Sequence, residues 1–264
     1  MYIFLLILSG IFGAVVGSFL NVVIYRLGTG TISKGRSICL SCGNKLRVRD
    51  LFPIISFLML RGKCSNCKSK ISSQYITVET IMMFISILIF MQLNLAYSLL
   101  YIFSNVIFYT TAFAILIVIF FYDLKHKIIP DELSFIFAAI SFAAMFFTID
   151  GIAFPGIFEI LAGPALAFIP ALIFFLSKGE WMGLGDAKLF LGVGWFLGFV
   201  LGWSAFVLSF WLGSIIAVFL IYKNKKYNLQ SEIPFAPYIV AATFIIFFTK
   251  IDIIGLSTLL TLAK

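Results

Sequence analysis

Apolar runs of membrane-spanning length follow one another along this chain almost from end to end. The first covers Met1 to Tyr25, and later runs cover approximately 76–93, 97–121, 133–148, 157–177, 187–200, 203–222 and 235–260. A transmembrane helix needs about 20 mainly apolar residues. Only 11% of the 264 residues are charged, whereas soluble domains carry roughly 25%. The sequence therefore predicts an all-α polytopic membrane protein with about eight transmembrane helices.

Two of these runs need a separate argument. The first has no basic start and no Ala-x-Ala-like cleavage site, so we expect it to stay as a helix and not to act as a signal peptide. Within residues 187–222 no charge follows Lys188, and the stretch is too long for one span. We predict a turn at Gly198 to Gly202. The alternative is a GxxxG helix-packing face there, with the spacing that Gly13 and Gly17 have in the first run.

The basic residues indicate an orientation, because loops rich in Lys and Arg stay in the cytoplasm. If the segment after the first run is cytoplasmic and the spans alternate, 17 of the 19 basic residues lie inside. Only Lys250 and Lys264 then lie outside, together with both chain ends. The formal net charge of +8 is thereby explained by membrane topology and not by nucleic-acid binding.

All four cysteines lie in the one long hydrophilic loop, as two Cys-x-x-Cys pairs: Cys39 with Cys42, and Cys64 with Cys67. Each pair supplies two thiolates from one tight turn, and four thiolates match the tetrahedral coordination of Zn²⁺. Because the loop is predicted to be cytoplasmic, where thiols stay reduced, disulfides are the weaker alternative. A site with four protein ligands is closed, so we expect a structural zinc and not a catalytic one.

The acidic residues are few enough to be considered one by one. Most lie in predicted loops or near the outer face, where solvation explains them: Asp50, Asp131, Glu132, Asp150, Glu159, Glu180, Glu232 and Asp252. Asp123 ends the third predicted span and Asp186 begins the sixth, so both are expected at the same membrane face. Each alone is consistent with an interfacial carboxylate paired with Lys125 or Lys188. Two at matched depth indicate a functional site, because ionisable groups in membranes are costly.

Two carboxylates with neither a catalytic metal nor a serine–histidine pair indicate aspartic proteolysis. His126 is the only histidine, which excludes a zinc hydrolase with histidine ligands, and it is expected to be an interfacial basic residue. Two close carboxyl groups share one proton, so that one activates water while the other polarises the scissile carbonyl. Gly183 and Gly185 are expected to leave room for an extended substrate, and they permit dihedrals closed to other residues. Asp186 then begins a helix whose N-terminus favours the carboxylate.

These residues occur in an ordered set of motifs. In chain order they are GSFLNVVIYRL (17–27), the two cysteine pairs, LFPIISFLMLRGKC (51–64), QYITVET (74–80), DLKHKIIPDEL (123–133), GLGDAKL (183–189) and IPFAPYI (233–239). In this set the chain resembles the type IV prepilin peptidases, membrane aspartic proteases that cut the leader from prepilins and pseudopilins. The resemblance covers nearly the whole chain.

The resemblance implies roles for particular residues. Asp123 and Asp186 correspond to the catalytic pair, and Gly183 and Gly185 to the glycines of the family's GxGD motif. The four cysteines correspond to the family's metal-binding cysteines. Glu79 matches the family's glutamate after the loop, and we expect it either to contact the substrate amino group or to support the loop, with a plain interfacial carboxylate as the equal alternative.

The resemblance also implies substrates and a second activity. The substrate would be a prepilin or pseudopilin with a short basic leader and an apolar helix, cut after a Gly at the cytoplasmic boundary of the bacterial inner membrane. Many members also methylate the new amino terminus with S-adenosylmethionine. No GxGxxG loop marks that cofactor here, so the second activity rests on resemblance alone. Which pilin is the substrate and which oligomer forms are left open.

The sequence departs from the family pattern in three places. GTGTISKGRSI replaces the proline-rich approach to the first cysteine pair, Gln74-Tyr75-Ile76 replaces Arg-Tyr-Pro, and Pro234-Phe235-Ala236-Pro237 replaces Pro-Phe-Gly-Pro. We expect none of these departures to touch Asp123 or Asp186.

Three regions are expected from this pattern: a first transmembrane helix at 1–27, a zinc-binding loop domain at 28–75 and a seven-helix membrane core at 76–264. Two other functions compete with leader cleavage. The first is another GxGD intramembrane protease, resembling presenilin-type enzymes. The cysteine pairs and the segment Ile24-Tyr25-Arg26 disfavour it. The second is a carrier that uses membrane carboxylates as a proton relay, although no internal repeat and no mid-membrane charge support it.

Overall fold

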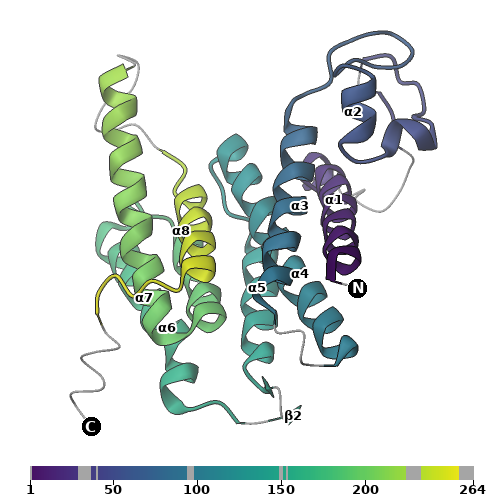
Figure 1. Ribbon diagram of the computed structural model, residues 1–264. Helices are drawn as coiled ribbons and strands as arrows, with labels where there is room; N and C mark the ends of the chain where they lie inside the picture. The colour runs from purple at the N-terminus through teal and green to yellow at the C-terminus, as the bar shows by residue number, and fades with distance from the viewer. Residues whose placement is uncertain are drawn as a thin grey trace. The chain divides into compact units, whose positions relative to one another are not determined.

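The structure is a computed structural model that describes residues 2–28, 37–39, 41–93, 98–148, 151–152, 154–223 and 233–255. Figure 1 shows its elements. The helices are α1 (Tyr2–Arg26), η1 (Val48–Leu51), α2 (Ile55–Met59), α3 (Gln74–Gln92), α4 (Leu99–His126), α5 (Asp131–Ala144), α6 (Ile157–Ser177), α7 (Leu184–Lys223) and α8 (Ala236–Thr249). The strands β1 (Phe147–Thr148) and β2 (Gly151–Ile152) form a minimal antiparallel hairpin.

The prediction of an all-α polytopic protein with eight helices is confirmed among the described residues. In the part of the chain that the structure describes, five helices are long and apolar enough to cross a membrane, namely α1, α3, α4, α6 and α7. The correspondence with the predicted spans is not one to one, because α2 is a short helix inside the hydrophilic loop and α7 contains two predicted spans. α8 is apolar but has 14 residues, since Lys250 takes a left-handed conformation and ends it. The predicted run 235–260 is therefore too long, although 256–260 lie outside the described residues.

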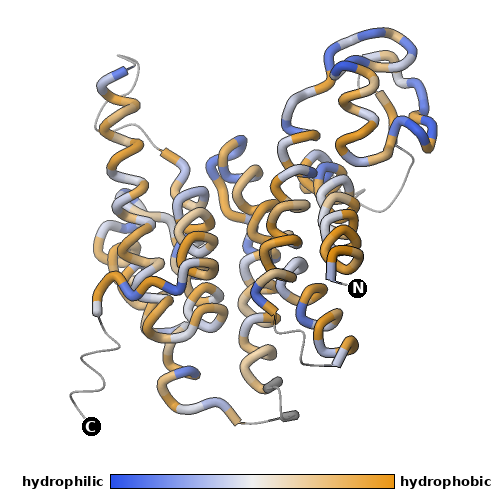
Figure 2. The backbone as a smooth tube through the Cα atoms, in the orientation of Figure 1, coloured by the Kyte–Doolittle hydropathy of each residue, from blue (hydrophilic) through white to orange (hydrophobic). Residues whose placement is uncertain are grey.

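The chain divides into two compact units, Met1–Val118 (unit 1) and Ile119–Lys264 (unit 2), with the boundary inside α4. In unit 1, α1 packs against α3, and the hydrophilic loop with α2 joins the end of α1 to the start of α3. Figure 2 shows most of the hydrophilic residues of this unit in that loop. The predicted division into regions 1–27, 28–75 and 76–264 stays a prediction. In the structure, α1, the hydrophilic loop and α3 belong to one compact unit.

Two glycines set the close packing of α1 on α3. A Cβ added to Gly13 would meet the carbonyl oxygen of Met82, and one added to Gly17 would lie 2.7 Å from the Cα of Glu79. Both contacts are with backbone or with the base of a side chain and cannot easily yield. Small residues at this four-residue spacing let two helix backbones approach closely in a membrane protein. The close approach also brings the C-terminal end of α1 against the first turns of α3.

α7 is the centre of unit 2 and contacts α5, α6 and α8. It is not a straight helix, because Gly198 has φ 78° and ψ 177°. The ring centroids of Phe190 and Phe206 are 4.9 Å apart, whereas 16 residues of straight helix would separate them by about 24 Å. The chain therefore folds back at Gly198, and the predicted turn that divides residues 187–222 is confirmed.

The interface of α6 with α7 is made by small residues. A Cβ on Gly194 would lie 2.5 Å from the carbonyl oxygen of Ala162 and 2.7 Å from the Cα of Gly163. Beside them the indole N–H of Trp195 donates to the carbonyl oxygen of Ile160 at 2.9 Å. These contacts hold the part of α7 before Gly198, which carries Asp186, in a fixed position within unit 2.

Candidate functional site

Asp123 lies in the last turn of α4 and is buried, with 3% of its surface exposed. Its Oδ2 accepts a hydrogen bond of 3.1 Å from the backbone N–H of Ala236. Ala236 is the first residue of α8, so a helix N-terminus with its partial positive charge faces this carboxylate. The end of α4 is the unfavourable end of a helix for an anion, and the start of α8 offsets that.

This contact corrects one expectation from the sequence. The segment Pro234 to Pro237 was expected to lie away from the two aspartates, and its Ala236 instead donates to Asp123. The contact joins residues 113 positions apart in the chain, and it is made by a backbone group, so no residue type in the sequence signals it. The proline at the second helical position is a weak sign of a helix start there.

Asp186 is the third residue of α7 and is 7% exposed. Its backbone N–H donates to the carbonyl oxygen of Gly183 at 3.2 Å, and the backbone N–H of Gly183 donates to the Asp186 carboxylate. This reciprocal arrangement has the form of a capping box, in which an acidic side chain at the third position bonds the residue that caps the helix. The helix start therefore fixes the direction of the carboxylate, as expected from the sequence.

The two glycines of the Gly-Leu-Gly-Asp motif differ from each other. Neither has a positive φ, so neither uses the left-handed dihedrals that glycine permits. A Cβ on Gly185 would lie 3.0 Å from the Cβ of Ile129, so Gly185 makes room for the segment between α4 and α5. A Cβ on Gly183 would meet nothing nearer than Asp186 Oδ2 at 3.6 Å. Contact of either glycine with a substrate stays a prediction.

The carboxylates of Asp123 and Asp186 are close enough to interact electrostatically, and both belong to unit 2. The alternative in which Asp186 is neutralised by Lys188 does not occur, since Lys188 Nζ lies 2.7 Å from Asp131 Oδ2. The His126 ring packs on the Tyr122 ring at 4.5 Å between centroids. The structure therefore brings together two buried carboxylates from α4 and α7, each oriented by the start of a helix.

The four cysteines of unit 1 form a second site. Their sulfur atoms all lie within 4.8 Å of one another, and those of Cys39 and Cys67 are 3.8 Å apart. Tetrahedral zinc with Zn–S bonds of about 2.3 Å requires sulfur atoms about 3.8 Å apart, so the spacing fits such an ion. The four thiols are thus placed to bind a metal ion, as predicted.

The two cysteine turns have the same geometry. In the first, the Cys39 N–H donates to the carbonyl oxygen of Asn44 at 2.9 Å, and in the second the Cys64 N–H donates to that of Ser69 at 2.9 Å. The residue after each second cysteine, Gly43 or Lys68, has a positive φ of 69° or 60°. Each turn therefore presents its two sulfur atoms toward the same cluster.

The surroundings of the turns lower the pKa of two thiols, Cys39 and Cys67, and raise that of Cys42. Hydrogen bonds from the backbone N–H groups of Cys42 and Ser41 lower the pKa of the Cys39 thiol to about 6. The pKa of the Cys67 thiol is also lowered, mainly by the hydrogen bond with the Ser69 hydroxyl. Thiolates, and not thiols, are the metal ligands, so both shifts favour metal binding.

Glu79 lies in α3 with 7% of its surface exposed. Its Oε2 accepts a hydrogen bond of 2.6 Å from the backbone N–H of Ile54, and the Ser18 hydroxyl of α1 also bonds to the carboxylate. Ile54 has φ 63° and ψ −52°, a strained conformation for a β-branched residue, and it immediately precedes α2. The structure therefore gives Glu79 the loop-supporting contact that was one of its predicted roles.

Comparison with known proteins identifies the family. The family model described as the bacterial peptidase A24 N-terminal domain matches residues 11–93, and that of the type IV leader peptidase family matches residues 110–222. A Vibrio cholerae protein named prepilin leader peptidase/N-methyltransferase is 30% identical over 94% of this chain and 98% of its own length. The chain belongs to the type IV leader peptidase family.

Other relatives with the same name agree. The Legionella pneumophila protein is 28% identical over 96% of this chain and 94% of its own length, and the Pseudomonas aeruginosa protein is 26% identical over 88% and 86%. No solved structure matches the chain. The first family model spans the cysteine site and Glu79, and the second spans Asp123 and Asp186.

Proposed function

We propose that this protein is a membrane aspartic endopeptidase that removes the short basic leader of prepilins or pseudopilins, with Asp123 and Asp186 as its catalytic residues. The observation that carries the proposal is that α4 and α7 bring these two aspartates, 63 positions apart in the chain, within electrostatic reach while burying both. Family membership and the names of the relatives support the same reaction.

The chemistry uses both carboxyl groups and one shared proton. The ionised carboxylate takes a proton from water as the water oxygen adds to the scissile carbonyl carbon, and the protonated carboxyl group gives its proton to the carbonyl oxygen. Collapse of the tetrahedral intermediate breaks the C–N bond, and the leaving nitrogen takes a proton from the dyad. The N–H groups of Gly183 and Ala236 hold the two side chains in place and stabilise their negative charge.

The proposal includes the membrane setting. The loop with the four cysteines and the end of α4 would lie in the cytoplasm with both termini outside, because this orientation places 17 of the 19 basic residues inside. The leader of the substrate would then approach the aspartates from the cytoplasm while its apolar helix stays in the bilayer. Zn²⁺ would be held by the four cysteines in a structural role.

We further propose that the protein methylates the new amino terminus with S-adenosylmethionine, as the names of its relatives suggest. The four-cysteine zinc site supplies no open coordination position for this step, so the methyl transfer would depend on other residues.

A cleavage assay tests both activities. The purified protein is incubated in liposomes with a model prepilin, with and without S-adenosylmethionine, and the products are measured by mass spectrometry. We expect loss of the leader after a Gly, no cleavage by Asp186→Asn, and a methyl-sized mass gain only with the cofactor. Folded protein that cleaves none of several prepilins would contradict the peptidase and favour the carrier alternative.

A further inference from the structure

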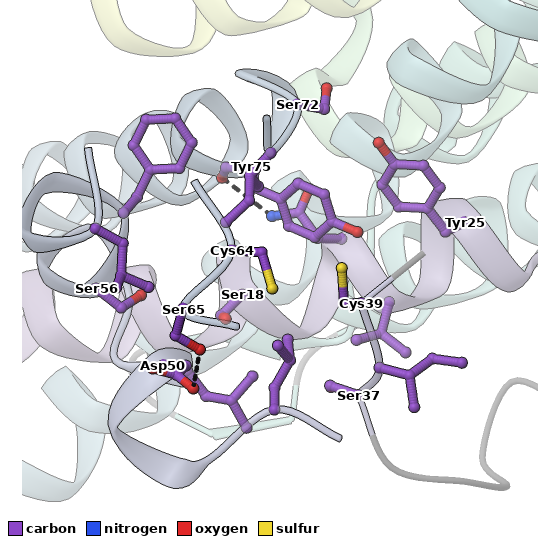
Figure 3. Close-up of a pocket in the computed structure, with 18 of the residues that line it drawn as sticks. Ser18, Tyr25, Ser37, Cys39, Asp50, Ser56, Cys64, Ser65, Ser72 and Tyr75 are labelled. Carbon is purple, nitrogen blue, oxygen red and sulfur yellow. Dashed lines mark hydrogen bonds between the residues drawn. The ribbon is translucent and has the colours of Figure 1, made fainter. Parts of the chain in front are cut away.

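A cavity of about 570 Å³ lies in unit 1. It is lined by α1, by α3 and by the hydrophilic loop that carries the four cysteines, called the cysteine loop below. Figure 3 shows Ser18 and Tyr25 of α1, Tyr75 of α3, and Cys39 and Cys64 of the loop around it. Its volume is in the range of small-molecule sites, about 300–1,000 Å³. The residues of the proposed cleavage reaction all belong to unit 2, so this cavity has no role in that reaction as proposed.

The distribution of charge in unit 1 points to this cavity. Residues 1–118 contain ten basic residues but only two acidic ones, Asp50 and Glu79, and both acidic residues line the cavity, together with Arg26 and Lys70. Asp50 accepts hydrogen bonds from the Ser65 hydroxyl at 3.1 Å and the Arg47 backbone N–H at 3.2 Å. The donors to Glu79 described above are also uncharged. A carboxylate has about four lone-pair positions, so both keep the capacity to accept further bonds.

Asn21 adds an acceptor without a partner. Its side chain is almost fully buried, with 1% exposed, and it lines the cavity. The amide Nδ2 donates to the carbonyl oxygens of Gly17 at 3.3 Å and Tyr75 at 3.1 Å, which sets the orientation of the amide because the reverse would place oxygen against two carbonyls. Within the described residues, Oδ1 has no hydrogen-bond partner. A buried acceptor left in this state is costly, and a donor on a bound ligand would satisfy it.

The rest of the cavity wall offers apolar and aromatic surface. Val22, Leu51, Phe57 and Ile71 contribute apolar surface. The rings of Tyr25 and Tyr75 are stacked, with centroids 5.2 Å apart and an interplanar angle of 16°. Aromatic faces attract cations, and an apolar wall accepts a hydrocarbon side chain.

We infer that this cavity binds a protonated α-amino group attached to an apolar body, with Asn21 Oδ1 and the Glu79 carboxylate as acceptors and Asp50 nearby. Arg26 and Lys70 also line the cavity, but an anionic ligand would leave the Asn21 oxygen unpaired. The identity of the ligand rests on the proposed function, because both partners of the proposed methyl transfer carry an α-ammonium group: the new amino terminus of the cleaved pilin, and the methionine end of S-adenosylmethionine.

The experiment measures binding to the full chain in detergent micelles by titration calorimetry. Three probes are used: a short peptide amide with an apolar first residue and a free amino terminus, the same peptide with an acetylated amino terminus, and S-adenosylhomocysteine. The variants are Glu79→Gln and Asn21→Leu. Glu79→Gln keeps an oxygen for the Ile54 N–H and so serves as the variant least prone to misfold. Ser141→Ala is the matched control, because Ser141 Oγ is also buried without a partner among the residues that the structure describes, but belongs to α5.

We expect the free peptide to bind at least about tenfold more tightly than the acetylated peptide, and Glu79→Gln and Asn21→Leu each to weaken that binding about tenfold, whereas Ser141→Ala leaves it unchanged. Binding of S-adenosylhomocysteine with the same dependence on Glu79 would assign the cavity to the methyl donor and supports the inference equally. The inference is wrong if no probe binds. It is also wrong if neither acetylation of the peptide nor Glu79→Gln changes the affinity.

Leader cleavage is measured on the same preparations. Wild-type protein that cleaves prepilin but binds the free and the acetylated peptide equally would defeat this inference and leave the proposed peptidase intact. Wild-type protein that binds the free peptide through Glu79 but cleaves no prepilin would defeat the peptidase and leave the site intact.

Discussion

The cysteine loop of unit 1 and the aspartate site of unit 2 position their functional atoms by opposite means. In the loop, two turns of similar geometry each carry two ligands close together in the sequence, and the backbone hydrogen bonds that close each turn, such as Cys39 N–H to Asn44 and Cys64 N–H to Ser69, are local. In unit 2, Asp123 and Asp186 come from different helices, and one of them is held by a third helix. The comparison indicates that the metal site is encoded locally, whereas the carboxylate site exists only when α4, α7 and α8 pack together.

The largest effect is expected from the aspartates themselves. Asp123→Asn or Asp186→Asn should lower the rate of leader cleavage by about 10²–10⁴-fold, because either change removes half of the acid–base pair. Initial rates are measured on protein that elutes as a monodisperse species. Asp131→Asn is the matched control, since it removes a carboxylate of the same unit that pairs with Lys188. Near-normal cleavage by either variant would remove that residue from the dyad and weaken the contrast between the two regions.

The metal site should respond to a single ligand change without affecting the other unit. We expect about one Zn²⁺ per wild-type chain and almost none in Cys42→Ser, because a three-thiolate site lacks the closed tetrahedral set. Elemental analysis of reduced protein measures the stoichiometry, and limited proteolysis should show faster cutting in the loop. Ser41→Ala, in the same turn, should keep the metal. Full zinc content in Cys42→Ser, or no zinc in the wild type, would refute the assignment of the site.

The dependence of unit 2 on packing can be tested away from the carboxylates. Gly194→Ala should destabilise the protein by about 1–3 kcal/mol, because the new Cβ meets the backbone of α6, which cannot move aside cheaply. Gly156→Ala, where a Cβ meets nothing within 4 Å, is the matched control. Thermal unfolding in detergent measures both. Equal midpoints would show that the α6–α7 interface is looser than the structure indicates.

The smallest effect is expected within the Gly-Leu-Gly-Asp motif. Gly185→Ala should lower the cleavage rate about tenfold by displacing Ile129 or the start of α7, since small misplacements of a catalytic group are costly. Gly183→Ala should lower the cleavage rate less, because its new Cβ meets nothing nearer than 3.6 Å. The opposite ranking would mean that the space beside Gly183 is occupied by substrate, and would support the role first expected from the sequence.

Much of this protein was predictable because the physical causes are local. The apolar runs predict the long helices, the spacing of Cys39, Cys42, Cys64 and Cys67 predicts the metal site, and Gly198 marks the fold-back of α7. The capping role of Gly183 beside Asp186 is equally local. Where an expectation was wrong, at the end of α8, the sequence pattern allowed several backbones and the structure selected one.

The sequence by itself determined that the chain is a helical membrane protein with a four-thiol site and two aspartates at helix ends, because periodicity, hydropathy and short spacings act within a few turns of chain. Only the tertiary structure decided that Ala236 donates to Asp123, that Gly185 accommodates Ile129, and that Asp50, Glu79 and Asn21 line one cavity. These contacts are made by backbone groups and by residues far apart in the chain. Their positions follow from how closely the helices can approach, which no short stretch of sequence specifies.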